Sequence, residues 1–424
     1  MKALAGVRIL DMTHVQAGPT ASQLMAWMGA DVIKFENPIG DATRGQLRDV
    51  PNADSLYFTM LNCNKRSITV NMKNAEGKKV FVELLKKCDI VMENFGPGVL
   101  DRFGFTWEKI HEINPRVIMG SIKGFGSSGP YSDFKAYENV AQAMGGSMST
   151  TGTPDGQPFV TGAQIGDSGT GLHLVIGLLA ALQQRHTSGQ GQYVEVAMMD
   201  AVMNLCRVKF RDHQRLFRGP LPEYSVGTHQ GMGAVPRAGN DSGGGQLGNA
   251  IRCKPGGSND FIYIVVQEAV WKDLGKRIGE ELGLPDLVND ARFATINERR
   301  NHQKDMWELI GEFALHYTKR EFMAILNELD VPCGPIMSTE DLFQDEHVLG
   351  REMVVELDHP QRGNWFNVGM PIKLSDSPAE IKRSPTLGEH TDEILREVLA
   401  MPDAEIARMR EAGAFSKDVK KVST

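Results

Sequence analysis

The first half of the chain alternates short apolar runs with longer segments of helical spacing. The apolar runs are typical of buried strands and lie at residues 6–12, 31–36, 67–72, 88–94, 116–125 and 192–197. Helical spacing is found at residues 18–28, 75–87, 107–113, 136–145, 167–186 and 198–217. Strands and helices in alternation form right-handed crossovers and a mostly parallel sheet. The pattern therefore predicts an α/β, Rossmann-like domain with helices on both faces of the sheet.

The pattern changes after Arg218. Residues 219–260 are rich in Gly, Pro and Ser, which predicts a linker and a mobile loop. Beyond them the pattern predicts a strand at 261–266, helices near 268–282 and 301–329, and two strands joined by a turn at Arg362-Gly363. A last helix begins near residue 390, where Thr391 or Asp392 could cap it.

Composition narrows the class of protein. The chain has 424 residues, of which 41% are hydrophobic and 23% charged, as in a soluble protein with two or more domains. A formal net charge of −7 argues against nucleic acid or an anionic membrane as the main partner. Five cysteines without a CxxC pair predict a reduced, cytoplasmic protein with neither disulfides nor a metal site. We expect no signal peptide, because Asp11 precedes any long apolar run at the N-terminus. We also expect no membrane span, because the most apolar stretch, residues 172–182, is short.

One carboxylate stands out at the start of a predicted helix. Asp167 lies among glycines in "TGAQIGDSGTGLHLVIGLLAAL". Asp is a preferred helix N-cap, so its carboxylate could simply accept N–H groups of the first turn. Glycines also let a ligand approach the backbone closely, and the helix dipole would keep the carboxylate ionised for attack on an activated carbonyl. The segment alone leaves both readings open.

Two further segments follow predicted strands, where ligands of parallel sheets bind. "HVQAGP" opens at His14 and holds Gln16, whose amide could donate to an oxyanion, although a simple turn is the more ordinary reading. It lacks the G-x-G-x-x-G pattern of dinucleotide sites. "ENFGPGVLDRFG" begins at Glu93 and could hold an adenine and its phosphates, with Arg102 close by in sequence. "KAYENV" and the glycine run "SGGGQ" are weak signals on their own.

Taken together, these motifs resemble a known family. "HVQAGP", "DATRGQLRD", "ENFGPGVLDRFGFTWE", "KAYENVAQAMGG", "GDSGTGLHLVIGLLAAL", "SGGGQ" and "LGEHTDEIL" are similar, in the same order, to those of the formyl-CoA:oxalate CoA-transferases, within the class III (family III) CoA-transferases. The resemblance implies an interlocked homodimer. It also implies a large Rossmann-like domain from residues 1–202, a linker at 203–224, a small inserted domain at 225–325, and a return to the large domain over 326–424.

The resemblance also implies the chemistry. Asp167 would form a mixed anhydride and then an aspartyl-CoA thioester while CoA moves from an acyl-CoA, formyl-CoA being favoured, to oxalate. The implied catalytic residues are Asp167, Gln16, Gly243 and Gly244. The implied substrate contacts are Gly245, Gln246, Tyr57, Gln46, Tyr137 and Glu138. The implied coenzyme A contacts are His14, Val15, Ala17, Asn37, Val70, Lys73, Asn94, Phe95, Gly96, Arg102, Lys135 and Met198.

The sequence departs from the family pattern at three places. Ser242 stands at the first position of a four-glycine loop, which we expect to alter the motion of that loop. Gln46 stands where one branch of the family has a tryptophan near the substrate, and Asn37 stands where that branch has an arginine near the adenine. Donors such as acetyl-CoA or succinyl-CoA, and an α-methylacyl-CoA racemase-type reaction, therefore stay open as alternatives. So does a non-catalytic acyl-CoA-binding protein, since a fold alone does not fix function.

Overall fold

The computed structural model describes the whole chain except residues 225, 242–245, 285 and 417–424. It divides into two compact units. The first comprises Met1–Ser147, Thr161–Cys206 and Leu349–Thr424, and the second Met148–Val160 and Arg207–Val348. Both chain ends therefore contribute to the first unit. The domain boundaries expected from the sequence differ from this division in detail and stay a prediction.

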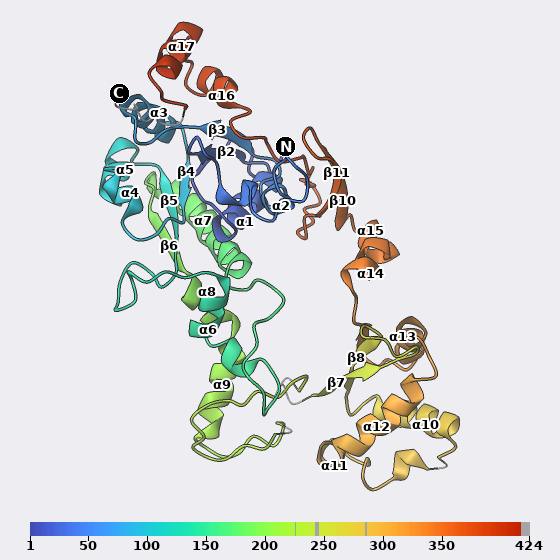
Figure 1. The fold of residues 1–424 in the computed structure, drawn as a ribbon. Coiled ribbons are helices and arrows are strands. Elements are labelled where there is room, and N and C mark those ends of the chain that lie inside the picture. Colours follow the sequence, from blue (N-terminus) through green and yellow to red (C-terminus); the bar gives the residue numbers. More distant parts are fainter. Residues whose placement is uncertain (225, 242–245, 285, 417–424) are drawn as a thin grey trace, which may run out of the picture. The chain divides into compact units, whose positions relative to one another are not determined.

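A six-stranded parallel sheet forms the centre of the first unit, with the order β3-β2-β1-β4-β5-β6 (Figure 1). Its strands are β1 (Arg8–Asp11), β2 (Asp31–Glu36), β3 (Arg66–Thr69), β4 (Ile90–Glu93), β5 (Ile118–Lys123) and β6 (Tyr193–Ala197). Every neighbouring pair is parallel. The predicted α/β architecture with a parallel sheet is confirmed. The chain leaves β1 toward β2 on one side and crosses to β4 on the other, so the strand order reverses between β1 and β4.

Helices cover both faces of this sheet because successive strand residues point to opposite sides. Ile9 belongs to a core with α1 (Ala17–Trp27) and α7 (Ser168–Ser188), whereas its neighbour Leu10 belongs to a separate core. That second core contains residues of α3 (Ala75–Leu85), α5 (Trp107–Ile113), α16 (Thr391–Glu397) and α17 (Asp403–Glu411). The last two helices come from the C-terminal end of the chain.

Shorter elements complete the first unit. These are η1 (Ala42–Arg44), α2 (Leu56–Leu61), α4 (Val99–Arg102), α6 (Glu138–Met144), α8 (Met198–Leu205), and the hairpin of β10 (Val354–His359) and β11 (Gly363–Val368). The hairpin turn lies where the sequence predicts it, before Gly363. No helix among the described residues combines the length and apolar character that crossing a membrane requires.

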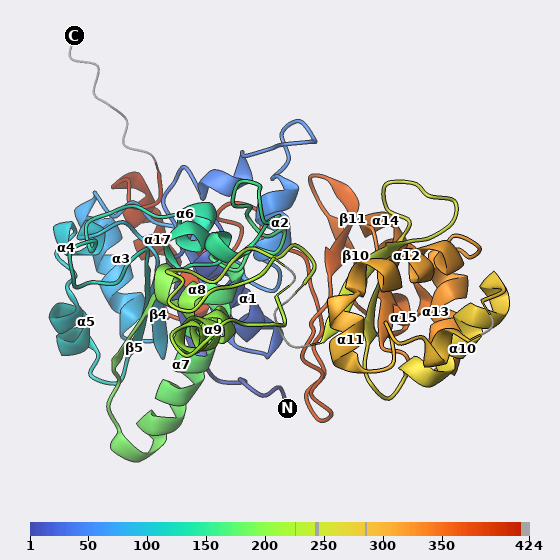
Figure 2. The same ribbon diagram turned by 90° about the horizontal axis from the view of Figure 1, so that it is seen from below.

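The second unit has its own antiparallel sheet, two strands of which are labelled in Figure 1, and its own core; Figure 2 shows several of its helices from below. The sheet has the order β7-β8-β9, from Leu247–Arg252, Phe261–Val266 and Cys333–Pro335. Its helical elements are η2 (Met148–Thr150), α9 (Arg207–Leu216), α10 (Trp271–Leu282), η3 (Leu287–Asn289), α11 (Ile296–Asn301), α12 (Gln303–Ala314), α13 (Lys319–Glu328) and α14 (Thr339–Gln344). The chain returns to the first unit through α15 (Glu346–Gly350).

Four expectations from the apolar pattern are wrong. The helix expected over 198–217 is interrupted at Cys206, where neither Gly nor Pro marks the break. The helix expected over 301–329 ends after Ala314 and restarts at a capping box on Thr318. The region expected to be a linker, 219–260, contains β7, whose Leu247 side chain is buried in the second core. Thr391 begins α16 rather than capping it, because His390 holds the cap position.

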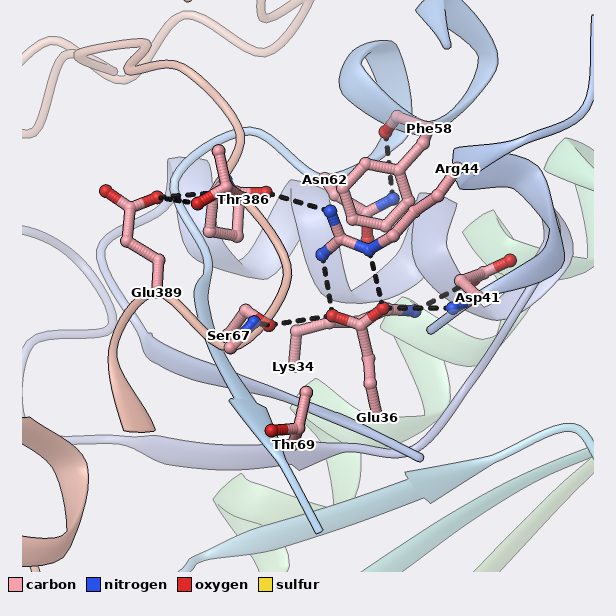
Figure 3. A network of polar contacts seen from close by, with 12 residues as sticks. Lys34, Glu36, Asp41, Arg44, Phe58, Asn62, Ser67, Thr69, Thr386 and Glu389 are labelled. Atoms are coloured by element: carbon pink, nitrogen blue, oxygen red, sulfur yellow. Dashed lines mark hydrogen bonds and ion pairs between the residues drawn. The ribbon is translucent and has the colours of Figure 1, made fainter. Parts of the chain in front are cut away.

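A network of buried charges joins the carboxyl end of β2 to the C-terminal segment (Figure 3). The Arg44 guanidinium donates to both carboxylate oxygens of Glu36, at 2.8 and 2.7 Å, and to Asp54 at 2.5 Å. It also donates to the Pro385 carbonyl at 3.2 Å, and it stacks over the Phe58 ring at 3.6 Å. Charges removed from water need such complete pairing, so the network depends on each partner.

We expect Arg44→Ala to lower the free energy of unfolding by about 3–5 kcal/mol, because it leaves the buried Glu36 carboxylate without its ion-pair partner. Urea denaturation measures the change. The control is Lys79→Ala, which breaks an exposed ion pair with Glu76 and should cost at most about 1 kcal/mol. An equal loss for both variants would contradict the importance of the buried network.

Candidate active site

A cleft of about 260 Å³ lies where the strand order reverses, at the carboxyl ends of the central strands. Ligands of open parallel sheets bind at this position, because the loops leaving neighbouring strands part there. The turn after β1, the turn after β4 and the start of α7 meet in it. Eleven residues singled out from the sequence line it: His14, Val15, Gln16, Ala17, Asn94, Phe95, Gly96, Lys135, Tyr137, Asp167 and Met198.

A second cavity, of about 320 Å³, shares His14 and Phe95 with the first. Asn37 and Val70, two of the expected coenzyme A contacts, line it together with Met72. Two adjoining cavities with common walls can hold one long ligand with chemically different ends.

Other expected contacts lie elsewhere. Lys73, Arg102 and Gln46 are exposed and line neither cavity. Lys73 and Gln46 were expected at the ligand from the resemblance, and Arg102 also because it lies close in sequence to the predicted adenine site; these contacts stay predictions. Gly243, Gly244 and Gly245 fall outside the described residues, as does Ser242, and Gln246 is exposed in the second unit.

Asp167 occupies the N-cap position of α7, but its carboxylate makes no capping hydrogen bond. The first-turn N–H groups of Ser168 and Gly169 donate instead to the Gln164 carbonyl, at 2.9 and 3.3 Å, and Glu138 binds the backbone just before the helix. The N–H groups of Gly166 and Asp167 donate to the two oxygens of Glu138, at 3.0 and 2.5 Å. Gln142 donates to the same carboxylate at 2.6 Å. The Asp167 side chain is thus left available to the cleft that it lines.

The electrostatic surroundings of Asp167 differ from the sequence-based expectation. A helix N-terminus was expected to favour the ionised carboxylate, which would lower its pKa. Burial and the negative charge of Glu138 instead raise the pKa of Asp167 from 3.8 to about 6. The carboxylate is still mostly ionised at pH 7, because this pH lies about one unit above its pKa. It is an anion held in unfavourable surroundings.

Gln16 connects this carboxylate's helix to a tyrosine. Its amide nitrogen donates to the Ser168 hydroxyl at 3.0 Å, and its amide oxygen accepts from the Tyr57 hydroxyl at 3.1 Å. Burial, followed by the charges of Asp167, Asp41 and Glu138, raises the pKa of Tyr57 to about 12. Tyr57 therefore stays a proton donor at neutral pH and fixes the orientation of the Gln16 amide. Ser168 was not anticipated from the sequence.

The turn that carries Gln16 contains a strained residue. Val15 has a φ of 62°, in the left-handed region that β-branched side chains rarely adopt. Such a conformation costs about 1–3 kcal/mol and persists only where the surroundings enforce it. Asn94 brackets the preceding residue, because its side chain accepts from the His14 N–H and donates to the His14 carbonyl, both at 2.8 Å.

Two buried charges that the sequence reading missed also hold this turn. Asp41 accepts the Val15 N–H at 3.2 Å, and Lys34 donates to both Asp41, at 3.2 Å, and the Thr13 carbonyl. Burial alone would raise the pKa of Asp41, but Lys34 and Thr43 outweigh it and lower the pKa. A lysine inside the apolar strand "DVIKFE" was the available signal, since lysine is almost never fully buried without a partner.

Comparison with known proteins fits this site. Residues 4–391 match the model of CoA-transferase family III. The chain belongs to this family. It is therefore an enzyme whose substrates are coenzyme A thioesters. Within the described residues of this CoA-transferase, no group of three or more His, Cys, Asp or Glu is placed to hold a metal ion.

Relatives cover nearly the whole CoA-transferase chain. A Streptomyces coelicolor protein named formyl-CoA:oxalate CoA-transferase is 55% identical over 415 residues, which are 98% of this chain and 99% of that protein. A Bradyrhizobium protein of the same name is 58% identical over 419 residues, 98% and 97% of the two chains. A crystal structure of a CAIB/BAIF family protein from Brucella suis has a TM-score of 0.81 at 30% identity, covering 93% of this chain and 99% of the other.

We expect Asp167→Asn to stabilise the CoA-transferase above pH 6. The folded-state pKa lies above the unfolded one, so ionisation of Asp167 opposes folding. This destabilisation is fully present above about pH 6, shrinks as the pH falls toward 4, and vanishes below it. After allowance for partial exposure, the gain should be about 1–2 kcal/mol at pH 8.

Thermal unfolding at pH 8 and pH 4.5 measures this difference. The exposed Asp133→Asn serves as the control and should change stability little at either pH. An Asp167→Asn variant that is less stable than the wild type at pH 8 would show that the carboxylate is satisfied in the fold.

Proposed function

We propose that this enzyme transfers coenzyme A from formyl-CoA to oxalate, with Asp167 as a covalent nucleophile. The substrates come from the names of the relatives, which match along the whole chain. The observation that carries the mechanism is the Asp167 carboxylate, which lines the cleft without a capping bond and has a raised pKa. A carboxylate bound by several N–H groups would be a weaker nucleophile.

The first half of the reaction moves CoA onto the enzyme. One Asp167 oxygen attacks the thioester carbonyl of formyl-CoA, the C–S bond breaks, and CoA leaves as a thiolate. The product is a formyl-aspartyl anhydride. The thiolate then attacks the aspartyl carbonyl, and formate leaves with the oxygen that had come from Asp167. An aspartyl-CoA thioester remains.

The second half mirrors the first. An oxalate oxygen attacks the aspartyl thioester carbonyl, and the CoA thiolate leaves again. The thiolate attacks the oxalyl carbonyl of the new anhydride and departs as oxalyl-CoA. The Asp167 carboxylate is regenerated with one oxygen from oxalate. Each step exchanges acyl groups of similar activation, so the balance needs no further reactant.

Gln16 is the side chain best placed to assist these steps. Each attack on a carbonyl carbon turns the carbonyl oxygen into an oxyanion. These oxyanions form next to the Asp167 carboxylate, beside the start of α7. The Gln16 amide bonds Ser168, the residue next to Asp167, and has a second N–H that can donate to an oxyanion. We propose this role for Gln16, with Tyr57 as its support.

The remaining parts of the proposal concern water and coenzyme A. Anhydrides and thioesters hydrolyse, so the reaction requires a covered site. We propose the glycine run 242–246 as that cover, on the resemblance alone. The coenzyme would extend from the Asp167 cleft into the cavity lined by Asn37 and Val70, which shares His14 and Phe95 with the cleft.

We expect Asp167→Ala to abolish transfer while leaving coenzyme A binding largely intact, because the cleft keeps its other walls.

A matrix of formyl-CoA, acetyl-CoA and succinyl-CoA against oxalate, formate and acetate tests the substrates, with acyl-CoA products separated by chromatography. The formyl-CoA and oxalate pair should give the highest kcat/KM. Normal turnover by Asp167→Ala would contradict the covalent mechanism, and hydrogen exchange at a substrate α-carbon without transfer would favour a racemase.

The proposed assembly is an interlocked homodimer. The described part of the first unit exposes apolar side chains on the helices beside the cleft. Leu172 and Ile176 of α7 are 49% and 67% exposed, and Val140 and Met144 of α6 are also uncovered. Apolar positions one helical turn apart on exposed faces mark surfaces that another chain covers.

We expect the wild type to sediment as a dimer at micromolar concentration, and Ile176→Asp to weaken the dimer by placing a charge in the covered surface. The control, Leu47→Asp, changes an isolated exposed leucine and should leave the dimer intact. A wild type that sediments as a monomer would contradict the proposed assembly.

A further inference from the structure

Four backbone groups of the turn before Gln16 are held by side chains of other segments. Its Thr13 carbonyl accepts from Lys34, its His14 N–H and carbonyl are bracketed by Asn94, and its Val15 N–H donates to Asp41. Asp41 opens the segment "DATRGQLRD", for which the proposed chemistry gives no role.

Asp41 is built into a fixed position. Its side chain and that of Lys34 are each 1% exposed. Its backbone N–H donates to Glu36 at 3.0 Å, and its carboxylate accepts the Thr43 N–H at 3.0 Å and the Thr43 hydroxyl at 2.8 Å. With all of these contacts formed, the carboxylate cannot follow the turn if the turn relaxes. It therefore acts as a rigid anchor for the Val15 N–H.

The conformation of Val15 decides where Gln16 points. A valine in the left-handed region would relax to an ordinary conformation if its N–H were released. Such a change at one residue redirects the chain that follows, and Gln16 is the next residue. Its amide would then lose its positions on Ser168 and Tyr57.

We propose that Asp41, held in place by Lys34, is a positioning residue for CoA transfer. It enforces the left-handed conformation of Val15 and so aims the Gln16 amide at the reacting acyl group. This inference rests on the proposed function, specifically on the role of Gln16 at the oxyanion. The competing explanation is that the Lys34–Asp41 pair only stabilises the fold. In that case the loss caused by Asp41→Asn would be the same with and without Gln16, whereas positioning requires Gln16.

The test compares Asp41→Asn in the wild type and in a Gln16→Ala background, with formyl-CoA and oxalate as substrates. Alone, Asp41→Asn should lower kcat about 10- to 100-fold while the KM for formyl-CoA changes less than about threefold, because a small misplacement of a reacting group costs that much. In the Gln16→Ala background it should change kcat less than about twofold. An equal loss in both backgrounds would overturn the inference.

A matched control and a rescue sharpen the comparison. Asp54→Asn removes another buried carboxylate from the Arg44 network without touching the turn, and should leave kcat within about twofold. In a Val15→Asn background, the loss of kcat caused by Asp41→Asn should be at least about fivefold smaller than in the wild type. The reason is that Asn enters the left-handed region more readily than Val. A loss of kcat in Asp54→Asn equal to that in Asp41→Asn, or no recovery, would count against positioning.

Three further outcomes are separable. If Asp41→Asn does not fold because Lys34 is left buried and unpaired, the double variant Lys34→Met/Asp41→Asn removes both charges and replaces it in the same comparison. If Gln16→Ala itself keeps normal kcat, the proposed role of Gln16 fails and the inference falls with it. If Gln16→Ala is impaired but Asp41→Asn adds its full loss, the inference alone fails.

Discussion

A carboxylate just before a helix normally accepts N–H groups of the first turn, and those bonds make it a stable, unreactive anion. Asp167 holds that place without making them: the N–H groups of residues 168 and 169 donate to the Gln164 carbonyl, and Glu138 accepts those of residues 166 and 167, just before the first turn. The same Glu138 adds a negative charge beside Asp167. Together with burial this raises the pKa to about 6. The side chain is thereby ionised at neutral pH but poorly stabilised, the condition that a nucleophilic carboxylate needs.

Much of the first unit can be understood as the frame around this carboxylate. The reversal of strand order between β1 and β4 opens a cleft, and two turns and one helix start bring their polar groups to it. Behind the turn after β1, buried charges on β2 and in the segment that follows hold a strained backbone in place. The same charge network continues through Glu36 and Arg44 to Pro385, so the C-terminal segment is anchored to this frame. Stability and site geometry therefore share one set of interactions.

The sequence predicted the parallel sheet and the cleft well, because both follow from local signals. Apolar runs at 31–36 and 88–94 mark strands, and polar residues directly after strands mark the carboxyl edge. The break at Cys206 was not predictable, since no residue there disfavours a helix. Contacts that depend on tertiary packing could not be predicted from the sequence either. The pairing of Lys34 with Asp41, the bonds of Glu138 to residues 166 and 167, and the exposure of Arg102 each depend on how distant segments meet.

The most direct measurement follows the oxygen atoms of Asp167. The enzyme is turned over with formyl-CoA and oxygen-18-labelled oxalate, and the peptide containing Asp167 is fragmented in a mass spectrometer. The covalent account predicts that oxygen-18 enters the Asp167 side chain, because each cycle returns that carboxylate with one oxalate oxygen. Label confined to oxalyl-CoA and free oxalate, with Asp167 unlabelled after many turnovers, would contradict it.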